Sequence, residues 1–296
     1  MAKLAVIGSG VVGQATGKGF IAKGHEVVFC DINPETLAKL ENQGYKVCPP
    51  NLLEEEKGVK AFFLPVSTPT IDGKISLDFL KSAVANLGGG ALKKNNDYCI
   101  VVVRSTVPPN TTEGSLIPLL EKYSGKKAGK DFGVCMNPEY LRENSNEEDF
   151  KNPWIIIIGE LNAKSGEMLD EIYGPHSCPI IHTSIKEAEA QKYVHNLFNA
   201  CKISFFNEMR MVCEAVDVNA DKVFNLVAES AEASWNPKYG IRNFGAYGGS
   251  CLPKDTTAFL AWAKNELRKS MPLLRAVIKV NSIIKDKRNG LNGLLE

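Results

Sequence analysis

The segment from residue 4 to residue 31 constrains the fold of this chain more than any other. It reads LAVIGSGVVGQATGKGFIAKGHEVVFCD. The apolar run at its start predicts a buried parallel strand, the middle is typical of a helix, and the apolar VVFC predicts a second strand that ends at Asp31. Gly8, Gly10 and Gly13 stand between the first strand and the helix in the spacing G-x-G-x-x-G. This order of elements is typical of a βαβ unit that binds a dinucleotide.

Each glycine of this motif has a physical reason. Gly8 permits a tight turn, Gly10 lets the backbone approach a pyrophosphate, and Gly13 lets helix and strand pack closely. The helix N-terminus faces the negative charge, and Val12 inside the motif is a further expected cofactor contact. Asp31 can accept hydrogen bonds from a ribose diol and would repel a 2′-phosphate, so the motif favours NAD over NADP. The alternative is a structural turn followed by a chance acidic residue.

Further apolar runs alternate with helical stretches along the first part of the chain. They predict more buried strands, and together with the first two they predict a doubly wound α/β domain of the Rossmann type over residues 1–185. The runs are AFFLPV (61–66), YCIVVV (98–103), FGVCMN (132–137), WIIIIG (154–159) and PIIHT (179–183).

Three loops follow strands of this predicted sheet, at the edge where ligands of such sheets bind. Thr68 in PVSTPT and Thr106 in RSTVPPNTT stand beside prolines that stiffen their loops, and each can hydrogen-bond a ribose or phosphate or serve only in a turn. In NPEYLRE, Glu139 and Glu143 share one face if the segment is helical, and Arg142 can pair with either carboxylate. The alternative there is a surface cluster of ion pairs.

The second half of the chain is predicted to be helical. Residues 185–216 contain neither glycine nor proline, and their apolar residues recur at helical spacing, which predicts one long helix at a domain junction or a dimer seam. Lys192 and Asn196 lie four residues apart on one face of it. We therefore expect a helical central and dimerisation domain over residues 186–296.

The stretch GAYGGSCLPKD at 245–255 places a cysteine among glycines. Pro253 can begin a helix, so Cys251 stands just before a helix N-terminus, where the helix dipole and free N–H groups favour a thiolate. Asp255 can reach back as a base or orienting group, and Lys254 adds positive charge. The alternative is a buried cysteine beside a structural turn.

Composition excludes several classes of function. A net charge of +1 gives no reason to expect nucleic acid or an anionic membrane as a partner. The eight cysteines include no C-x-x-C pair and the four histidines are scattered, so no metal site is expected. This cysteine usage fits a reducing compartment, and the apolar runs are too short to span a bilayer, so we expect a cytoplasmic protein.

The motifs GSGVVG, STVPPNTT, NPEYLRE, AEAQKYVHN with FFNE, and GGSCLPKD follow one another along nearly the whole chain. In these motifs the chain resembles the UDP-glucose/GDP-mannose dehydrogenase family. The resemblance implies an NAD-dependent four-electron oxidoreductase of nucleotide sugars, with UDP-glucose as the first expected substrate and GDP-mannose as the second. It also implies polysaccharide biosynthesis. The long helix by itself leads us to expect a homodimer formed through it.

The resemblance implies covalent catalysis at Cys251. The C6 alcohol is oxidised to an aldehyde, the thiolate adds to it as a thiohemiacetal, a second hydride transfer leaves a thioester, and water releases the uronic acid. A thioester holds the acyl group while the cofactor is exchanged. By the same resemblance the other catalytic roles fall to Lys192 and Asn196 (oxyanion), Asp255 and Thr106 (water), and Glu143 (base for thioester hydrolysis).

The expected binding residues come from the same resemblance. Substrate contacts are expected from Glu139, Tyr140, Leu141, Lys192, Asn196 and Gly248, and cofactor contacts from Thr68, Thr106 and Lys254. Two features depart from the family. A further Rossmann-like domain that binds the substrate's nucleotide is expected to be largely absent from these 296 residues. Lys238 stands where arginine is common, which keeps the charge but loses the bidentate fork.

Two other classes of function remain open from the residues. A 3-hydroxyacid dehydrogenase also joins a Rossmann domain to long helices and uses a lysine with an asparagine four residues later, but it needs no cysteine. A non-catalytic NAD-binding or subunit-pairing relative would bind the cofactor without reducing it.

Overall fold

The computed structural model of the chain divides into two compact units, Met1–His195 (unit 1) and Asn196–Glu296 (unit 2). It describes residues 1–71, 74–142, 145–174, 178–236, 239–240, 246–249 and 252–292, without the side chains of 286–292. The predicted residues Cys251, Glu143 and Lys238 lie outside the described residues. The predicted domain boundary between residues 185 and 186 stays a prediction.

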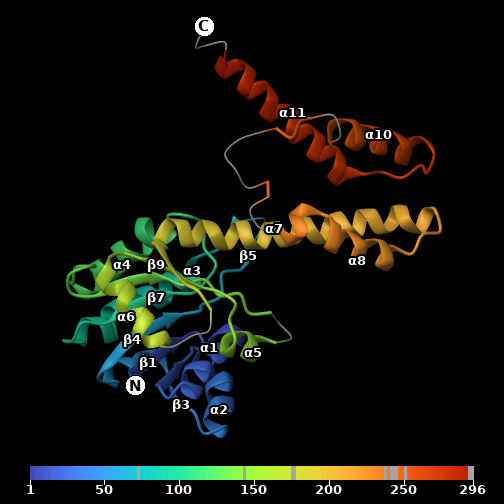
Figure 1. The fold of residues 1–296 in the computed structure, drawn as a ribbon. Coiled ribbons are helices and arrows are strands. Elements are labelled where there is room, and N and C mark those ends of the chain that lie inside the picture. Colours follow the sequence, from blue (N-terminus) through green and yellow to red (C-terminus); the bar gives the residue numbers. More distant parts are fainter. Residues whose placement is uncertain are drawn as a thin grey trace. The chain divides into compact units, whose positions relative to one another are not determined.

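Unit 1 is built on an eight-stranded sheet in the order β10-β9-β8-β7-β4-β1-β2-β3 (Figure 1). Neighbouring strands from β3 to β8 pair in parallel, which confirms the predicted Rossmann-type sheet. β9 pairs antiparallel with β8, and β10 is parallel to β9. The strands are β1 (Lys3–Ile7), β2 (Glu26–Cys30), β3 (Lys46–Cys48), β4 (Val59–Leu64), β7 (Ile100–Val103), β8 (Gly133–Met136), β9 (Ile156–Glu160) and β10 (Ile180–Ser184).

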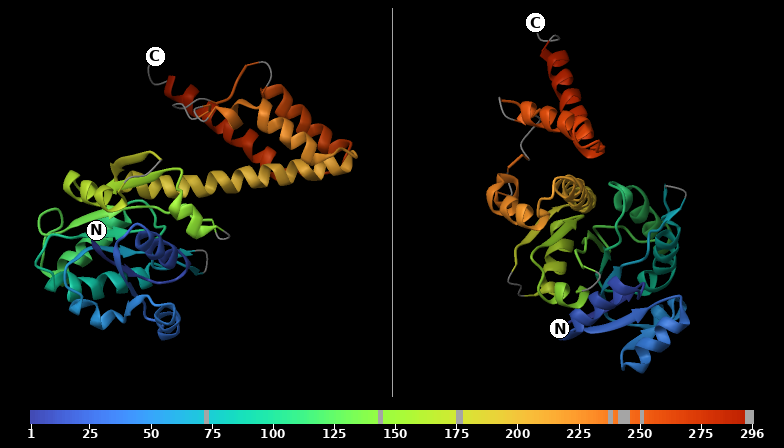
Figure 2. Two further views of the ribbon diagram at one scale, coloured as in Figure 1. Left: turned by 60° about the horizontal axis from the view of Figure 1, so that its bottom comes forward. Right: turned by 90° about the vertical axis from the view of Figure 1, so that its right-hand side faces the viewer.

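The strands are apolar because helices cover both faces of the sheet. Successive side chains of a strand point to opposite faces. Accordingly, Ala5 and Ile7 of β1 join one buried core, whereas Leu4 and Val6 join the other. Figure 2 shows helices on both sides of the sheet. Such two-sided burial explains runs like IVVV in β7, in which every residue is buried.

The helices of unit 1 connect these strands. The main ones are α1 (Val11–Ala22), α2 (Pro34–Asn42), α3 (Asp78–Leu87), α4 (Ile117–Ser124), α5 (Asn146–Lys151) and α6 (Ala163–Tyr173). Short 3-10 or π turns lie at Pro50–Glu55, Gly88–Leu92 and Thr112–Leu116, and a small hairpin pairs β5 (Thr70–Ile71) with β6 (Lys74–Ile75). The hairpin and β3 are too short to give a clear pattern in the sequence.

The long helix α7 spans Ile185–Ala215, which confirms the predicted helix. A reciprocal cap fixes its start. The carboxylate of Glu187 accepts hydrogen bonds from the Ser184 N–H (3.0 Å) and hydroxyl (2.7 Å), and the Glu187 N–H donates to the Ser184 hydroxyl (3.3 Å). Hydrogen bonds from Thr183 and Ser184 lower the pKa of Glu187 to about 2, so the cap is charged near neutral pH.

Helices are the regular secondary structure of unit 2 among its described residues. It contains the part of α7 from residue 196 and four further helices: α8 (Ala220–Ser230), α9 (Glu232–Trp235), α10 (Leu252–Asn265) and α11 (Pro272–Asn292). Val212, Ala263 and Met271 form its buried cluster, with Phe259 and Leu274 among the partly buried neighbours. This core is much smaller than the two cores of unit 1.

Candidate active site

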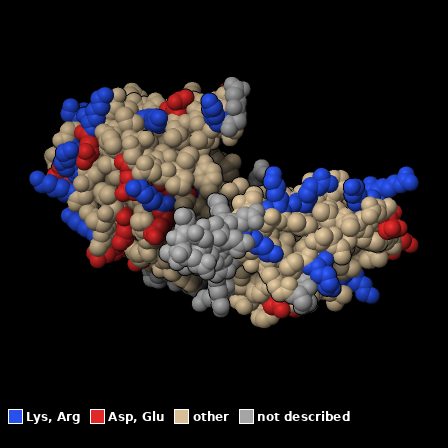
Figure 3. Space-filling view, turned by 90° about the horizontal axis from the view of Figure 1, so that it is seen from above, with Lys and Arg blue, Asp and Glu red and all other residues tan. Residues whose placement is uncertain are grey.

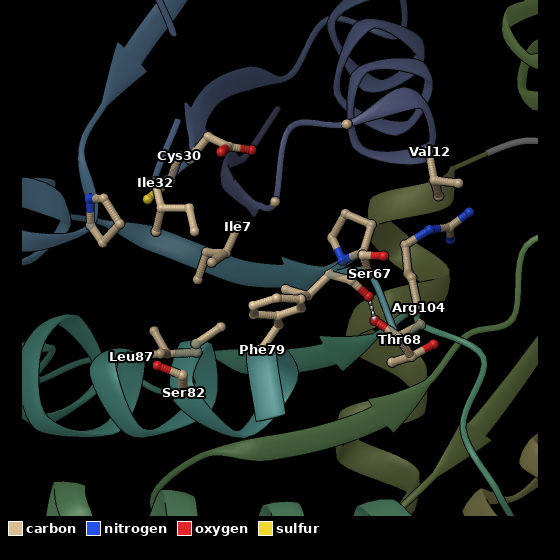
Figure 4. A pocket seen from close by; sticks show the side chains of 18 of the residues that line it. Ile7, Val12, Cys30, Ile32, Ser67, Thr68, Phe79, Ser82, Leu87 and Arg104 are labelled. Atoms are coloured by element: carbon tan, nitrogen blue, oxygen red, sulfur yellow. Dashed lines mark hydrogen bonds between the residues drawn. The ribbon is translucent and has the colours of Figure 1, made fainter. Parts of the chain in front are cut away.

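A cavity of about 650 Å³ opens in unit 1 at the carboxyl ends of β1, β2, β4 and β7. This is the edge at which the sequence places the candidate loops. Figure 4 shows apolar side chains such as Ile7, Phe79 and Leu87 along one part of the cavity and Thr68 and Arg104 at another. Seven predicted site residues line it: Gly8, Gly10, Val12, Asp31, Thr68, Thr106 and Glu139.

The glycine motif forms the turn expected of it. Gly8 has φ +101°, a left-handed conformation that favours glycine, and its N–H donates to the Cys30 carbonyl at 2.8 Å. A Cβ on Gly13 would lie 2.0 Å from the Gly8 carbonyl oxygen, so the first turn of α1 packs directly on the strand-ending turn. No atom lies within 4 Å of a Cβ built on Gly10. The backbone there is therefore open to a ligand group.

Asp31 is held at the rim of the cavity by two backbone N–H groups. Its Oδ2 accepts from the Ser9 N–H at 2.6 Å and its Oδ1 accepts from the Asn33 N–H at 2.8 Å. Each carboxylate oxygen keeps a further lone pair. A fixed, partly exposed carboxylate with spare acceptors suits a ribose diol.

The two threonines belong to neighbouring loops that are tied together. The Thr68 hydroxyl donates to the Thr106 carbonyl at 2.9 Å, which joins the loop after β4 to the loop after β7 (Figure 4). The Ser105 hydroxyl reinforces this join through the carbonyls of Val66 (2.6 Å) and Leu64 (3.0 Å). Thr68 thus has a loop-building role, and its oxygen can still accept from a ligand.

The described part of NPEYLRE, after β8, is an irregular segment and not a helical turn. The Leu141 N–H donates to the side chain of Glu139 at 2.6 Å. The Arg142 guanidinium binds Asp149 at 2.6 Å, and among the described residues no ion pair joins it to Glu139. Its expected pairing with Glu143 stays a prediction, since Glu143 lies outside the described residues. A bent segment turns the Arg142 side chain toward α5, where Asp149 lies.

Lys192, on α7, is almost fully buried at 5% exposure. Its Nζ donates to the Glu139 carbonyl and lies 3.3 Å from the Glu139 carboxylate. It also lies 5.0 Å from the centre of the Tyr140 ring, a favourable cation–π distance. The Tyr140 hydroxyl donates to Gln191, and burial raises the pKa of Tyr140 well above its usual range. Lys192 therefore lies beside Glu139, and Glu139 itself lines the cavity.

Comparison with known proteins gives a consistent picture. The NAD binding domain of the UDP-glucose/GDP-mannose dehydrogenase family matches residues 2–59 and 51–177, and the central domain of that family matches residues 186–283. The chain belongs to this family.

Individual relatives agree with the family match. The chain is 34% identical to the GDP-mannose 6-dehydrogenase of Pseudomonas aeruginosa over 95% of its length and 68% of the relative. It is also 34% identical to the UDP-glucose 6-dehydrogenase of Haloferax volcanii, covering 94% of this chain and 69% of that protein. The crystal structure of a ternary complex of the Pseudomonas aeruginosa enzyme superimposes with a TM-score of 0.90 at 32% identity, over 97% of this chain and 70% of that one.

The cofactor of this nucleotide-sugar dehydrogenase family is NAD, and the residues of unit 1 fit it. The open backbone at Gly10 and the N-terminus of α1 suit a pyrophosphate, and the Asp31 carboxylate suits a ribose. The described part of the chain contains no group of three or more His, Cys, Asp or Glu side chains placed to hold a metal ion. Among the same residues, no helix combines the length and apolar character needed to cross a bilayer.

The other predicted site residues that the structure describes belong to unit 2. Asn196 is exposed on α7, and Gly248 is exposed, with no atom within 4 Å of the place that a Cβ would occupy. Lys254 and Asp255 lie in the first turn of α10 and pair with each other at 2.7 Å, with both side chains exposed. α10 begins at Leu252, directly after position 251, which agrees with the predicted helix start.

The structure reveals two groups of residues that the sequence reasoning missed. Arg104, buried at the end of β7, donates to Asn137 and to the Tyr173 hydroxyl (2.8 Å), and its Nε has no partner among the described residues. Glu189, fully buried on α7, accepts from the N–H groups of Asn110 (2.6 Å) and Thr112 (2.8 Å). A lone arginine closing an apolar strand was a visible signal for the first group.

Proposed function

We propose that this chain catalyses the NAD-dependent four-electron oxidation of a nucleotide sugar at C6, from the alcohol to the carboxylate. The observation that carries the proposal is the buried Lys192 against Glu139, beside a cavity that fits NAD. Burying an ammonium group is costly unless its charge is paired. The Lys192 ammonium is paired with Glu139, which belongs to the expected substrate segment. NAD, when bound, accepts the hydride in each of the two oxidation steps.

In unit 1 the described residues bind and orient. Gly10 and the first turn of α1 receive the pyrophosphate, Asp31 holds a ribose, and Val12, Thr68 and Thr106 complete the cofactor contacts. Lys192 stabilises the negative oxygen that develops at C6, and Glu139 fixes the Lys192 ammonium. Tyr140 and Leu141 contribute the surface against which the sugar lies.

In unit 2 the chemistry centres on Cys251. Its thiolate adds to the C6 aldehyde, which forms the C–S bond of a thiohemiacetal. Loss of hydride from that carbon gives a thioester, and water then breaks the C–S bond to release the carboxylate and regenerate the thiol. Asn196 assists at the oxyanion, Asp255 and Thr106 hold the water, Glu143 removes its proton, Gly248 leaves room for the sugar and Lys254 contacts the cofactor.

The charge of unit 2 supports an anionic substrate. Figure 3 shows Lys and Arg side chains spread over the part of the surface that unit 2 forms. They include exposed residues of α10 and α11, namely Lys254, Lys264, Arg275, Lys279 and Lys285. A diphosphate-linked sugar carries negative charge that such a surface attracts. UDP-glucose is the first candidate, and GDP-mannose is the second because relatives acting on each are equally identical to this chain.

We also propose that two copies of the chain pair through unit 2. Large apolar side chains on the unit 2 part of α7 and on α8 are exposed: Leu197, Phe198, Ile203, Phe205, Met211 and Leu226. Several large exposed apolar side chains on two helices are what a subunit interface would cover.

The deciding experiment counts NADH formed per sugar consumed, with UDP-glucose and with GDP-mannose. The proposal expects two NADH per sugar for one of them, and no release of uronic acid by Cys251→Ala. Cys201→Ala, which removes an exposed cysteine of α7, is the matched control and retains activity. One NADH per sugar in the wild type would contradict the thioester step. NAD binding without NADH from either sugar would favour a non-catalytic relative.

A further inference from the structure

We propose that Asp149 is a positioning residue that sets the conformation of the substrate segment, residues 139–142. The inference rests on the proposed function, because it is that function which gives the segment its contact with the sugar. Asp149 lies on α5 (Asn146–Lys151), outside the cofactor cavity, and none of the catalytic roles above uses it.

Asp149 makes an unusually complete set of contacts for one carboxylate. It is 5% exposed. Its Oδ2 accepts from the Arg142 backbone N–H at 2.8 Å, from Arg142 Nε at 3.1 Å and from the Ser145 hydroxyl at 3.0 Å. Its Oδ1 accepts from Arg142 Nη2 at 2.6 Å. The bidentate guanidinium contact and the backbone contact converge on one residue, so both the main chain and the side chain of Arg142 are fixed.

Asp149 fixes Arg142 at the C-terminal end of the substrate segment. The N-terminal end of the segment is fixed as well. At that N-terminal end, the Asn137 side chain accepts from Arg104 and donates to the Ile157 carbonyl at 2.7 Å. Between the two ends, the Glu139 carbonyl accepts from Lys192 and the Tyr140 hydroxyl donates to Gln191. Asp149 is therefore one of two buried anchors between which the substrate-facing residues are held.

Asp149 can serve as an anchor because its own helix is tied to the core. The next residue, Phe150, is 5% exposed and meets the ring of Phe20 edge-on, with the ring centres 5.0 Å apart. A Cβ on Gly19 of α1 would lie 1.9 Å from the Phe150 ring, so α5 packs tightly on α1. The same helix α1 carries the glycine turn of the cofactor site. Asp149 thereby links the substrate segment to the element that receives the cofactor.

The charge of Asp149 is secure over the working range of pH. Hydrogen bonding from the Arg142 guanidinium lowers the pKa of Asp149 to about 2. Around the carboxylate, the facing polar groups are Arg142 and Ser145. The anchor holds at every pH at which the oxidation would be assayed, so its removal requires a substitution.

The test uses three variants, namely Asp149→Asn, Arg142→Ala and the double variant that combines these two. Each is compared with the control Glu147→Gln. Asn keeps the size of Asp but loses the charge and one acceptor. Glu147 is the matched control because it is a carboxylate on the same helix whose partner is the surface residue Lys18, at 3.4 Å. The measurements are kcat and KM for the nucleotide sugar, the Kd of NAD, the Tm, and amide hydrogen exchange at Leu141 and Arg142.

We expect Asp149→Asn to lower kcat by about 10-fold to 100-fold, as a misplacement of substrate contacts does, while the Kd of NAD changes less than about twofold. The double variant should have about the same kcat as Asp149→Asn, since both substitutions remove the same contact between Asp149 and Arg142. The Arg142 amide should exchange at least about 10-fold faster in Asp149→Asn than in Glu147→Gln. A role in stability alone would lower the Tm and leave kcat unchanged at temperatures at which the variant is folded.

Unchanged kcat in a folded Asp149→Asn variant, or a parallel loss of NAD affinity, would overturn the inference. If the wild type forms no NADH with any nucleotide sugar, the proposed function fails, and hydrogen exchange then decides separately whether Asp149 fixes the segment. In that event, equal hydrogen exchange of the Arg142 amide in Asp149→Asn and Glu147→Gln would overturn the inference that Asp149 fixes the segment.

Discussion

The two units of this chain bury their apolar residues very differently. In unit 1 the strands are enclosed on both faces, and large side chains such as Phe20, Phe63 and Phe132 are fully buried. In unit 2 the buried apolar side chains among the described residues are Val212, Ala220, Ala263 and Met271. Many larger ones there are exposed, including Phe198, Phe205, Leu226, Trp235 and Trp262. Unit 1 thus has a core of its own, whereas unit 2 presents apolar surface suited to a partner.

In both units, nevertheless, a glutamate of α7 caps the start of another helix. On α7, Glu189 in unit 1 caps the N–H groups of Asn110 and Thr112. Nineteen positions further along the same helix, Glu208 in unit 2 caps the N–H groups of Leu273 (2.9 Å) and Leu274 (3.1 Å) at the start of α11. Each carboxylate complements the positive end of another helix. The difference between the units therefore lies in packing, not in capping.

The largest expected effect separates these two caps. Glu189→Ala leaves the N–H group of the fully buried Thr112 without its partner and also removes the bond to the Asn110 N–H, so we expect a loss of about 3 kcal/mol in the free energy of unfolding. Glu208→Ala should cost less, about 1 kcal/mol, since Leu273 and Leu274 are only partly buried and water can replace the lost carboxylate at their N–H groups. Urea unfolding followed by circular dichroism measures both. Equal losses would show that unit 2 encloses its cap as fully as unit 1 does.

The second effect concerns the apolar surface of unit 2. Phe198→Glu places a charge on a 63% exposed phenylalanine of α7, and we expect dimerisation to weaken about 100-fold because a charge is costly in an apolar interface. Phe79→Glu is the control in unit 1, since Phe79 is also exposed but lines the cofactor cavity. It should weaken NAD binding and leave dimerisation unchanged. Sedimentation at several concentrations measures the equilibrium, and a monomeric wild type would contradict the proposed pairing.

Glycine substitutions sharpen the contrast at a smaller scale. In Gly17→Ala the new Cβ would lie 2.3 Å from the Phe29 ring, and we expect a loss of about 1–3 kcal/mol from overpacking. Gly248→Ala meets no atom within 4 Å, so its stability should change by less than about 0.5 kcal/mol. NADH formation by Gly248→Ala should still fall, because the methyl group occupies space proposed for the sugar. Thermal unfolding and the NADH assay, run on both variants, separate packing from function.

The smallest expected effect is a dependence on pH that belongs to unit 1. A hydrogen bond to Glu160 at 2.7 Å, helped by Asp170, raises the pKa of His182 above its usual 6.5. This stabilises the fold fully below pH 6.5, and the contribution is lost as pH rises through the higher pKa of the folded state. The ring is partly exposed, so we expect less than about 0.5 kcal/mol.

Unfolding of His182→Gln between pH 6 and pH 9 checks this assignment, since the wild type should lose a small part of its stability over that interval and the variant should not. A remaining slope of the same size in the variant would show that another group, such as a second histidine or a cysteine, is its source.

Local patterns of the sequence predicted most of the architecture. The apolar runs gave seven of the strands of the large sheet, and the absence of glycine and proline over 185–216 gave α7. The glycine turn and Asp31 were predictable because βαβ binding units need those residue types at fixed spacing. β3 and the β5–β6 hairpin were not, because strands of two or three residues are too short to show a periodicity.

Partner choice within the site was less predictable. Arg142 has acidic residues at positions 139, 143, 147, 148 and 149, and its selection of Asp149 depends on how the irregular segment bends toward α5. The burial of Lys192 was equally hidden, because the residue alone reads as a solvated lysine. Both contacts join segments whose approach is set by the sheet and by α7, not by neighbouring residues.

The sequence by itself determined the class of the protein: a Rossmann-type sheet, a long central helix, an NAD-binding turn and the motifs of a nucleotide-sugar dehydrogenase. These follow from short-range rules of periodicity, turn geometry and capping. Only the tertiary structure decided that the buried Lys192 pairs with Glu139, that Glu189 and Glu208 cap distant helices, and that Asp149 binds Arg142. Those contacts depend on where distant elements pack, and side-chain polar groups buried there must find partners wherever the packing places them.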